Sequence, residues 1–235
     1  MSPSRNAANK FVQYHAHMYI HKTIGNPVPK PICKDMSTVN IFEADIEDAE
    51  NIVNVFNSTL GENFIDIKEV IKQLESRDSL VVVAKDVGAA DVLGVGTAIY
   101  TPTSSDLAYY FYDNFEKACD LSPEIRLGNA VLLKSIGVLE NARGNGIGAL
   151  ITKHLVAWAE GINAESLYSL GWVDDKGCHI EKSFRYNNIK AMGELSHFWM
   201  RDSIEQKYLC PTCGNPCKCS AILFYRSLAN IDTAN

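Results

Sequence analysis

The chain has 235 residues, of which 46% are apolar, and its formal net charge is −6. This length is enough for one sizeable hydrophobic core with a small appendage. No apolar run reaches the roughly 18 residues that a membrane-spanning helix needs, and the first residues lack the apolar segment of a secretory signal. The negative charge disfavours nucleic acid as a partner, because that binding relies on lysine and arginine. We therefore expect a soluble, cytoplasmic protein.

The N-terminal segment differs from the rest of the chain because it contains closely spaced prolines. Pro27, Pro29 and Pro31 restrict the backbone to an extended conformation. We therefore expect three parts: an N-terminal arm over 1–38, one domain over 39–228, and a flexible tail over 229–235.

The first half of the domain alternates between strand and helix signals. Asp45 and Asp48 have the spacing of a capping box at a helix start. The apolar periodicity predicts the following order: a strand at 39–43, helices over 46–56 and 67–74, and a hairpin of strands at 79–85 and 92–100 about a turn at 86–91.

The segment 101–129 is longer than a hairpin loop should be. It contains an aromatic run at 109–112, which Asp113, Glu116 and Asp120 follow. One interpretation is a surface helix that packs on the sheet. The other is a lid over an amine-binding cleft, where aromatic rings and carboxylates would receive a cation.

The stretch from 131 to 160 carries the strongest functional signal. It predicts a buried strand at 131–138, a glycine turn, and an amphipathic helix whose apolar residues recur at three- and four-residue spacing. The turn reads Arg143-Gly-Asn-Gly-Ile-Gly148. Helix N-termini offer unpartnered N–H groups and a positive dipole end, so glycines there let an anion approach closely. The alternative is a structural turn without a ligand.

Three kinds of phosphate-binding turn compete for this stretch. A Walker A loop needs Lys-Ser/Thr after its last glycine, where this chain has Ala149-Leu150. The dinucleotide fingerprint is formally present from Gly144 to Ala149, but residues 139–143 separate it from the strand. The third pattern, Arg143-x-x-Gly146-x-Gly148, follows Ile136-x-Val138 and precedes the helix. It resembles the acetyl-CoA motif of the GNAT N-acetyltransferase superfamily.

The resemblance covers roughly residues 39 to 195 and implies an α/β (α+β) fold. In that fold a mixed, mostly antiparallel sheet has a splayed strand pair and helices on both faces. The implied cofactor is acetyl-CoA, with its pyrophosphate on the glycine turn and its pantetheine arm on the main chain of the preceding strand. The Val138 amide is the family's usual donor to the reacting carbonyl. The cofactor-binding residues it implies are Ile136, Gly137, Val138, Arg143, Gly144, Asn145, Gly146, Ile147 and Gly148.

After the central helix we expect a strand at 165–173 and a late helix near 179–189. By the resemblance, His179 falls where these proteins often carry an asparagine that touches the cofactor. Phe184 falls where many carry a tyrosine that reprotonates the CoA thiolate, so His179 or Cys178 would have to replace that acid. Tyr186 should face elsewhere, since it lies about 200° further around the helix.

No residue stands out as the general base. The candidates are carboxylates at the ends of predicted strands, Glu43 and Asp174, and Glu140 after the central strand. We therefore predict His179, Glu140 and Asp174 as the catalytic residues.

A second strong feature is a set of four cysteines, Cys210, Cys213, Cys217 and Cys219, among seven in the chain. Four thiolates suit a tetrahedral zinc ion, so we predict a structural zinc site that pins a terminal strand at 220–225. The alternatives are free thiols, a disulfide or a redox site. The other cysteines, expected to be buried or free thiols, are Cys33, Cys119 and Cys178.

We therefore predict an N-acetyltransferase that transfers the acetyl group of acetyl-CoA to a primary amine of unknown identity by direct attack. Two alternatives stay open. One is a non-catalytic module that binds CoA or docks a partner through the cysteine loop. The other is an oxidoreductase that uses the dinucleotide match. A homodimer is one open oligomeric state, because proteins of the resembled family often dimerise.

Overall fold

A mixed β-sheet forms the centre of this computed structural model, which describes residues 39–87 and 91–229. Its strands are β1 (Val39–Glu43), β2 (Ser79–Asp86), β3 (Val92–Thr101), β4 (Ala130–Val138), β5 (Ser166–Asp174), β6 (Gly177–Cys178), β7 (Lys190–Leu195) and β8 (Ser220–Ser227). They lie in the order β1-β2-β3-β4-β5-β8-β7, and β6 pairs with β5. Only the β4–β5 pair is parallel. The predicted mostly antiparallel sheet is confirmed.

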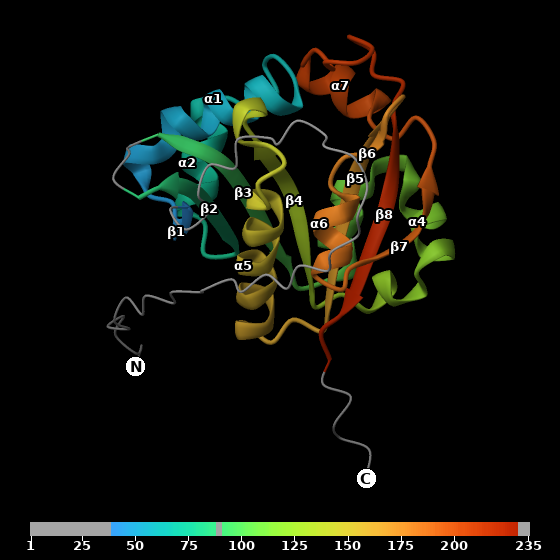
Figure 1. Cartoon of the computed structure of the whole chain (residues 1–235). Coiled ribbons are helices and arrows are strands. Elements are labelled where there is room, and N and C mark those ends of the chain that lie inside the picture. The colour runs from blue at the N-terminus through green and yellow to red at the C-terminus, as the bar shows by residue number, and fades with distance from the viewer. Residues whose placement is uncertain (1–38, 88–90, 230–235) are drawn as a thin grey trace, which may run out of the picture. The chain divides into compact units, whose positions relative to one another are not determined.

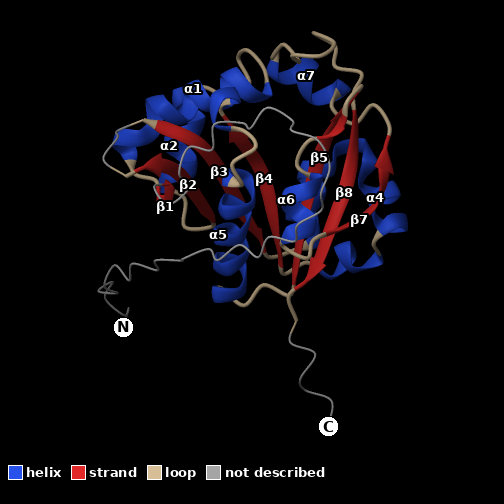
Figure 2. Cartoon of the chain, in the orientation of Figure 1, coloured by secondary structure: helices blue, strands red, loops and turns tan. Residues whose placement is uncertain are grey.

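Helices cover both faces of this sheet (Figures 1 and 2). They are α1 (Ala49–Leu60), α2 (Ile67–Glu75), α3 (Ser104–Phe111), α4 (Phe115–Leu121), α5 (Ile147–Gly161), α6 (Glu181–Tyr186) and α7 (Met200–Gln206). Val82 and Leu133 pack in the core beneath α5 and α6. Their neighbours point to the opposite face of the sheet. There Val81 packs against α1 and α2, and Leu132 packs against α3 and α4. We call these the α5 face and the α1 face.

The predicted elements of the first half are present. The strand at 39–43 is confirmed, and Asp45 forms the capping box with Asp48. The helix that follows extends to Leu60, four residues beyond the predicted end. β2 and β3 pair as the predicted hairpin. Residues 88–90 of its turn lie outside the described residues, as do the predicted arm and, except for its first residue, the tail.

The segment 101–129 folds into α3 and α4, which pack on the sheet. Leu107, Phe111 and Ile125 are fully buried there. Asp113 and Glu116 lie at the surface in ion pairs with arginines. The packing interpretation therefore accounts for most of this segment, and those two carboxylates are not free to receive a cation.

The parallel pair β4–β5 is paired only at its beginning. The register ends where Leu133 pairs with Ser169. Beyond that point β4 stays paired to β3, and β5 stays paired to β8. Lys134 is an extra residue in β4, because the β3–β4 register shifts there, and such a bulge bends and twists a strand. The predicted splayed strand pair is therefore present, and we call the unpaired stretch the split.

Candidate functional site

The glycine turn connects the end of β4 to the start of α5. Gly144 and Gly146 have φ angles of +81° and +75°, which glycine adopts without steric penalty. The first bond that closes α5 runs from the Leu150 N–H to the Gly146 oxygen at 3.0 Å. The amides of residues 147–149 therefore lie in the first turn, where a helix leaves its N–H groups unpaired. With the helix dipole, they make an environment suited to an anion.

The side chains of the turn hold it in shape. The exposed Arg143 donates from Nε to the Val138 carbonyl at 3.0 Å, and Asn145 donates from Nδ2 to the Ala142 carbonyl at 3.2 Å. The other guanidinium nitrogens of Arg143 make no hydrogen bond to any residue that the structure describes. The arginine therefore ties the turn to β4 and keeps its terminal donors available to a ligand.

The strand before the turn directs polar main-chain groups into the split. The Leu139 N–H donates to the Leu93 carbonyl of the β3 side at 2.9 Å. Main-chain groups alternate in direction along a strand, so those of Ile136 and Val138 point away from β3. On that side β5 is no longer paired with β4. The structure thus places the polar groups of Ile136 and the Val138 N–H where an extended ligand could replace a neighbouring strand, while the Val138 carbonyl accepts from Arg143.

Gly137 lies between these two residues and serves packing. A Cβ at this position would fall 2.4 Å from the Thr59 Oγ1 of α1 and 3.3 Å from a Phe56 ring carbon. The absence of a side chain therefore lets α1 approach β4 closely, and Gly137 helps to shape the split from the α1 face.

Two of the predicted catalytic residues form a pair. His179 Nε2 lies 3.0 Å from Asp174 Oδ2. The Asp174 side chain is 8% exposed, whereas that of His179 is 57% exposed. Burial alone would raise the pKa of Asp174, but the hydrogen bonds from His179 and from the Lys176 N–H outweigh it and hold the pKa below its ordinary value. Asp174 is therefore a charged anchor for His179, which makes it a poor proton acceptor.

The other predicted groups are more dispersed. Glu140 is exposed in the turn after β4, and Glu43 is exposed on edge strand β1, from which β2 and β3 separate β4. Phe184 is buried against Phe224, with ring centroids 4.9 Å apart, so this position belongs to the core. Tyr186 is 79% exposed, as its place on the helix predicted.

The four cysteines of the C-terminal loop converge. The measured Sγ–Sγ distances run from 3.6 to 3.8 Å, and all four sulfurs lie within 4.8 Å of one another. A tetrahedral ion with bonds of about 2.3 Å to sulfur requires edges of about 3.8 Å, whereas a disulfide bond is close to 2.05 Å. The sulfur arrangement therefore fits a zinc ion. Outside this loop, Cys119 and Cys178 are free thiols, and Cys33 lies outside the described residues.

The backbone around these sulfurs forms a tight turn over residues 210–219, which we call the knuckle. Cys210 and Gly214 exchange two main-chain hydrogen bonds of 2.9 and 3.2 Å, and the Lys218 N–H donates to the Cys213 sulfur at 3.1 Å. Burial raises the pKa of Cys219 to about 11. A cation bound by all four sulfurs would offset the cost of holding them as thiolates.

The cysteine loop also connects the two sides of the split. On the C-terminal side it packs against Trp172 of β5 and against Trp199. On the N-terminal side the Leu209 N–H donates to the Glu62 carbonyl of the α1–α2 connection at 2.9 Å, and the rings of Tyr208 and Phe64 meet edge to face. Sequence reasoning predicted the cysteine site but not this connection.

Solved structures of acetyltransferases share the fold of this chain. An N-acetyltransferase from Staphylococcus aureus Mu50 is 17% identical, with 81% of this chain and 98% of that chain covered and a TM-score of 0.53. A ribosomal-protein-alanine N-acetyltransferase from Brucella melitensis is 18% identical, with coverages of 80% and 99% and a TM-score of 0.53. The protein has the GNAT fold.

A third GNAT-fold structure is a phosphinothricin acetyltransferase from Sinorhizobium meliloti in complex with acetyl-CoA. It is 15% identical, with 84% of this chain and 92% of that chain covered and a TM-score of 0.53. No protein-family model matches the sequence, and no curated protein matches it. The resemblance to GNAT proteins is therefore carried by the fold and by the local motif, with little overall sequence identity.

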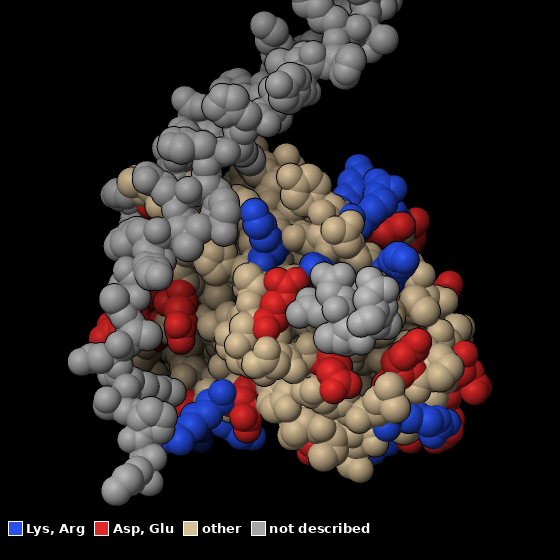
Figure 3. All heavy atoms as spheres, turned by 90° about the horizontal axis from the view of Figure 1, so that it is seen from below, with Lys and Arg blue, Asp and Glu red and all other residues tan. Residues whose placement is uncertain are grey.

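Two further features are the distribution of charge on the surface and the length and apolar character of the helices. In the view of Figure 3, acidic and basic side chains of the described residues are interspersed, without a continuous basic patch. None of the helices within 39–87 and 91–229 combines the length and apolar character that spanning a bilayer requires.

Proposed function

We propose that the protein transfers the acetyl group of acetyl-CoA to a primary amine. One observation carries the proposal: the split and the glycine turn lie at the same end of β4. An elongated ligand with an anionic end could therefore use both at once.

In this proposal the chain supplies mainly backbone groups. The N–H groups of residues 144–149 and the terminal nitrogens of Arg143 would hold the pyrophosphate. The main-chain groups of Ile136 and Val138 would hold the pantetheine arm, and the Val138 N–H would face the developing negative charge of the acetyl oxygen. Acetyl-CoA supplies the activated acetyl thioester. Orientation and backbone electrostatics would account for most of the rate enhancement.

We also propose that Cys210, Cys213, Cys217 and Cys219 hold one structural zinc ion. The sulfur spacing supports this assignment. A reducing compartment such as the cytoplasm would keep the four thiols available to the metal.

Two measurements test the acetyltransferase proposal. Isothermal titration with CoA should give saturable binding. Thiol release from acetyl-CoA should then accelerate with at least one amine among putrescine, L-lysine and a peptide that begins with alanine. Absence of CoA binding would refute the proposal.

The alternative function is a CoA-binding or partner-docking module without catalysis. The burial of Phe184, where the resemblance implies a catalytic tyrosine, favours this alternative. Saturable CoA binding without thiol release across the amine panel would support it. Turnover with any amine would exclude it.

A further inference from the structure

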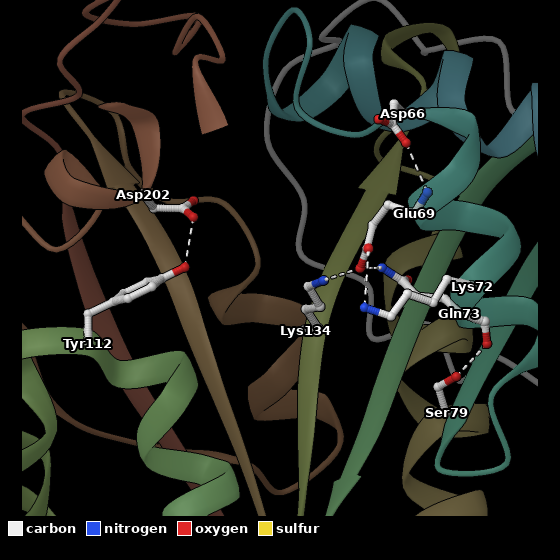
Figure 4. Close-up of polar contacts among 8 residues, drawn as sticks. All are labelled: Asp66, Glu69, Lys72, Gln73, Ser79, Tyr112, Lys134 and Asp202. Atoms are coloured by element: carbon white, nitrogen blue, oxygen red, sulfur yellow. Dashed lines mark hydrogen bonds and ion pairs between the residues drawn. The ribbon is translucent and has the colours of Figure 1, made fainter. Parts of the chain in front are cut away.

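A polar cluster lies on the α1 face where the split begins. Lys134, the bulged residue of β4, has its Nζ 3.6 Å from Glu69 Oε1 of α2. A second polar pair joins the segment after α3 to α7: the Tyr112 hydroxyl donates to Asp202 Oδ1 at 2.7 Å. Figure 4 shows the Lys134–Glu69 pair at the β4 ribbon and the Tyr112–Asp202 pair apart from it, with no contact drawn between the two pairs. With Tyr208, which lies close enough to Asp202 to affect its pKa, these residues form what we call the Asp202 cluster.

Asp202 differs from the carboxylates predicted as the base. Burial raises its pKa above the ordinary value, and Glu205 adds to that shift. The hydrogen bond from Tyr112, the nearby Tyr208 hydroxyl and the charge of Lys134 offset it only in part. Asp202 is thus a better proton acceptor than Asp174, whose pKa is held below its ordinary value.

The charges of the cluster favour a cation. Lys134 and Lys72 lie 3.6 and 4.0 Å from the Glu69 carboxylate, whereas Asp202 forms no ion pair with any residue within 39–87 and 91–229. Burial raises the pKa of Tyr112, so this phenol keeps its proton and stays a neutral donor. An ammonium group beside Asp202 would therefore balance the charge of that carboxylate. The Tyr112 ring itself already has the Arg201 guanidinium over it, 5.6 Å from the ring centroid.

The position of the cluster along β4 relates it to the proposed cofactor site. The glycine turn follows Val138, at the far end of the unpaired stretch, whereas Lys134 lies at its beginning. Ile136 is two residues from Lys134, which is about 7 Å along a strand. A ligand with its pyrophosphate on the turn and its arm along Ile136 and Val138 would therefore point its acyl end toward the Asp202 cluster.

The cysteine loop fixes the helix that carries Asp202. The Cys217 N–H donates to Ser203 Oγ at 2.8 Å. Asn215 Nδ2 donates to the Ser203 carbonyl and to the Tyr208 carbonyl, the latter at 3.1 Å. Ser203, the residue after Asp202, is thus tied to the knuckle, and the main chain of Tyr208 is tied to it as well. This gives the carboxylate a defined position without a bond to any of the four cysteine sulfurs.

We propose that Asp202 binds the ammonium group of the acceptor amine and removes its proton before acetyl transfer. The inference rests on the proposed function and deepens it. The ammonium gives one proton to the Asp202 carboxylate and becomes a neutral amine. The amine nitrogen then forms a bond to the acetyl carbon as the carbon–sulfur bond breaks. The CoA thiolate leaves with the bonding electron pair, and the second nitrogen proton and the Asp202 proton pass to the thiolate and to solvent.

The test compares Asp202→Asn with Glu75→Gln, which removes one negative charge from the exposed end of α2 on the same face of the sheet. The acceptor is whichever amine of the panel gives most thiol release with the wild-type protein. We expect Asp202→Asn to lower kcat/KM for that amine at neutral pH by 100-fold or more, the usual size of a lost general base. CoA binding should be unchanged by titration calorimetry, and Glu75→Gln should retain activity within about threefold.

The pH profile distinguishes a catalytic from a structural role. As pH rises toward the pKa of the amine, more acceptor arrives already deprotonated, so the deficit of Asp202→Asn should shrink. A deficit that is independent of pH, or activity within about threefold of wild type, would overturn this inference alone. If the wild-type protein releases no thiol with any amine of the panel, the proposed function fails as well.

Discussion

Replacement of Gly146 by glutamate tests the anion site at the start of α5. The new carboxylate would lie next to the amides proposed to hold a pyrophosphate. At a separation of about 5 Å and an effective dielectric constant of about 20, two like unit charges repel by about 3 kcal/mol. That repulsion alone corresponds to a loss of CoA affinity of at least 100-fold. Because Gly146 has a φ of +75°, any side chain there also costs about 1–2 kcal/mol of stability.

Two control variants separate charge from backbone strain. Gly146→Ala carries the strain without the charge, so it should lower the melting temperature while keeping most of the CoA affinity. Gly161→Glu places the same charge at the other end of α5, about 22 Å away, where a Cβ meets nothing within 4 Å. Titration calorimetry with CoA measures all three. Equal affinity of Gly146→Glu and wild type would refute an anion site at this turn.

Three further predictions concern the metal loop, α1 and the His179–Asp174 pair. Elemental analysis should find one zinc per chain, and a strong chelator should lower the melting temperature. Cys217→Ser should lower the melting temperature by the same amount and make it insensitive to the chelator. A metal-free protein of unchanged stability would contradict the zinc site. Gly137→Val should destabilise by about 1–3 kcal/mol in urea, because its side chain would overlap α1; an unchanged midpoint would show that α1 moves freely. Because the pKa of Asp174 is lower in the folded than in the unfolded chain, its ionised form stabilises the fold at pH values above the unfolded value of 3.8. This stabilisation is lost as the pH falls through the folded pKa. Asp174→Asn should therefore flatten the acid side of the stability profile below the unfolded value of 3.8, and a profile identical to wild type would count against the pair.

The sequence predicted the parts of the fold that depend on local signals. The hairpin of β2 and β3 follows from β-branched runs about a turn, and the Asp45–Asp48 box follows from capping chemistry over three residues. The glycine turn before α5 follows from the same kind of local pattern. Each of these signals lies within a few residues of the element that it specifies.

The remaining site residues depend on contacts between distant parts of the chain. Tyr112 and Asp202 are 90 residues apart, and nothing in the local sequence of either residue indicates the other. α7, which carries Asp202, is a short helix of seven residues without a strong apolar repeat. Asp174, nominated from its place at a strand end, has a lowered pKa because of His179 and the Lys176 N–H, and its proposed role stays a prediction. Only the packing of α7 against the segment 101–129 reveals the better candidate.

The split explains why the cysteine loop belongs to the site. β4 and β5 share only four register pairs, so the two halves of the sheet have few main-chain bonds between them at that boundary. The loop adds a connection elsewhere, through Leu209 and Glu62, while its knuckle packs against Trp172 of β5. Because the same loop holds α7 through Ser203, a metal bound there would fix both the distance across the split and the position of Asp202. The sheet can then stay open along β4 for a ligand without leaving its two halves loosely joined.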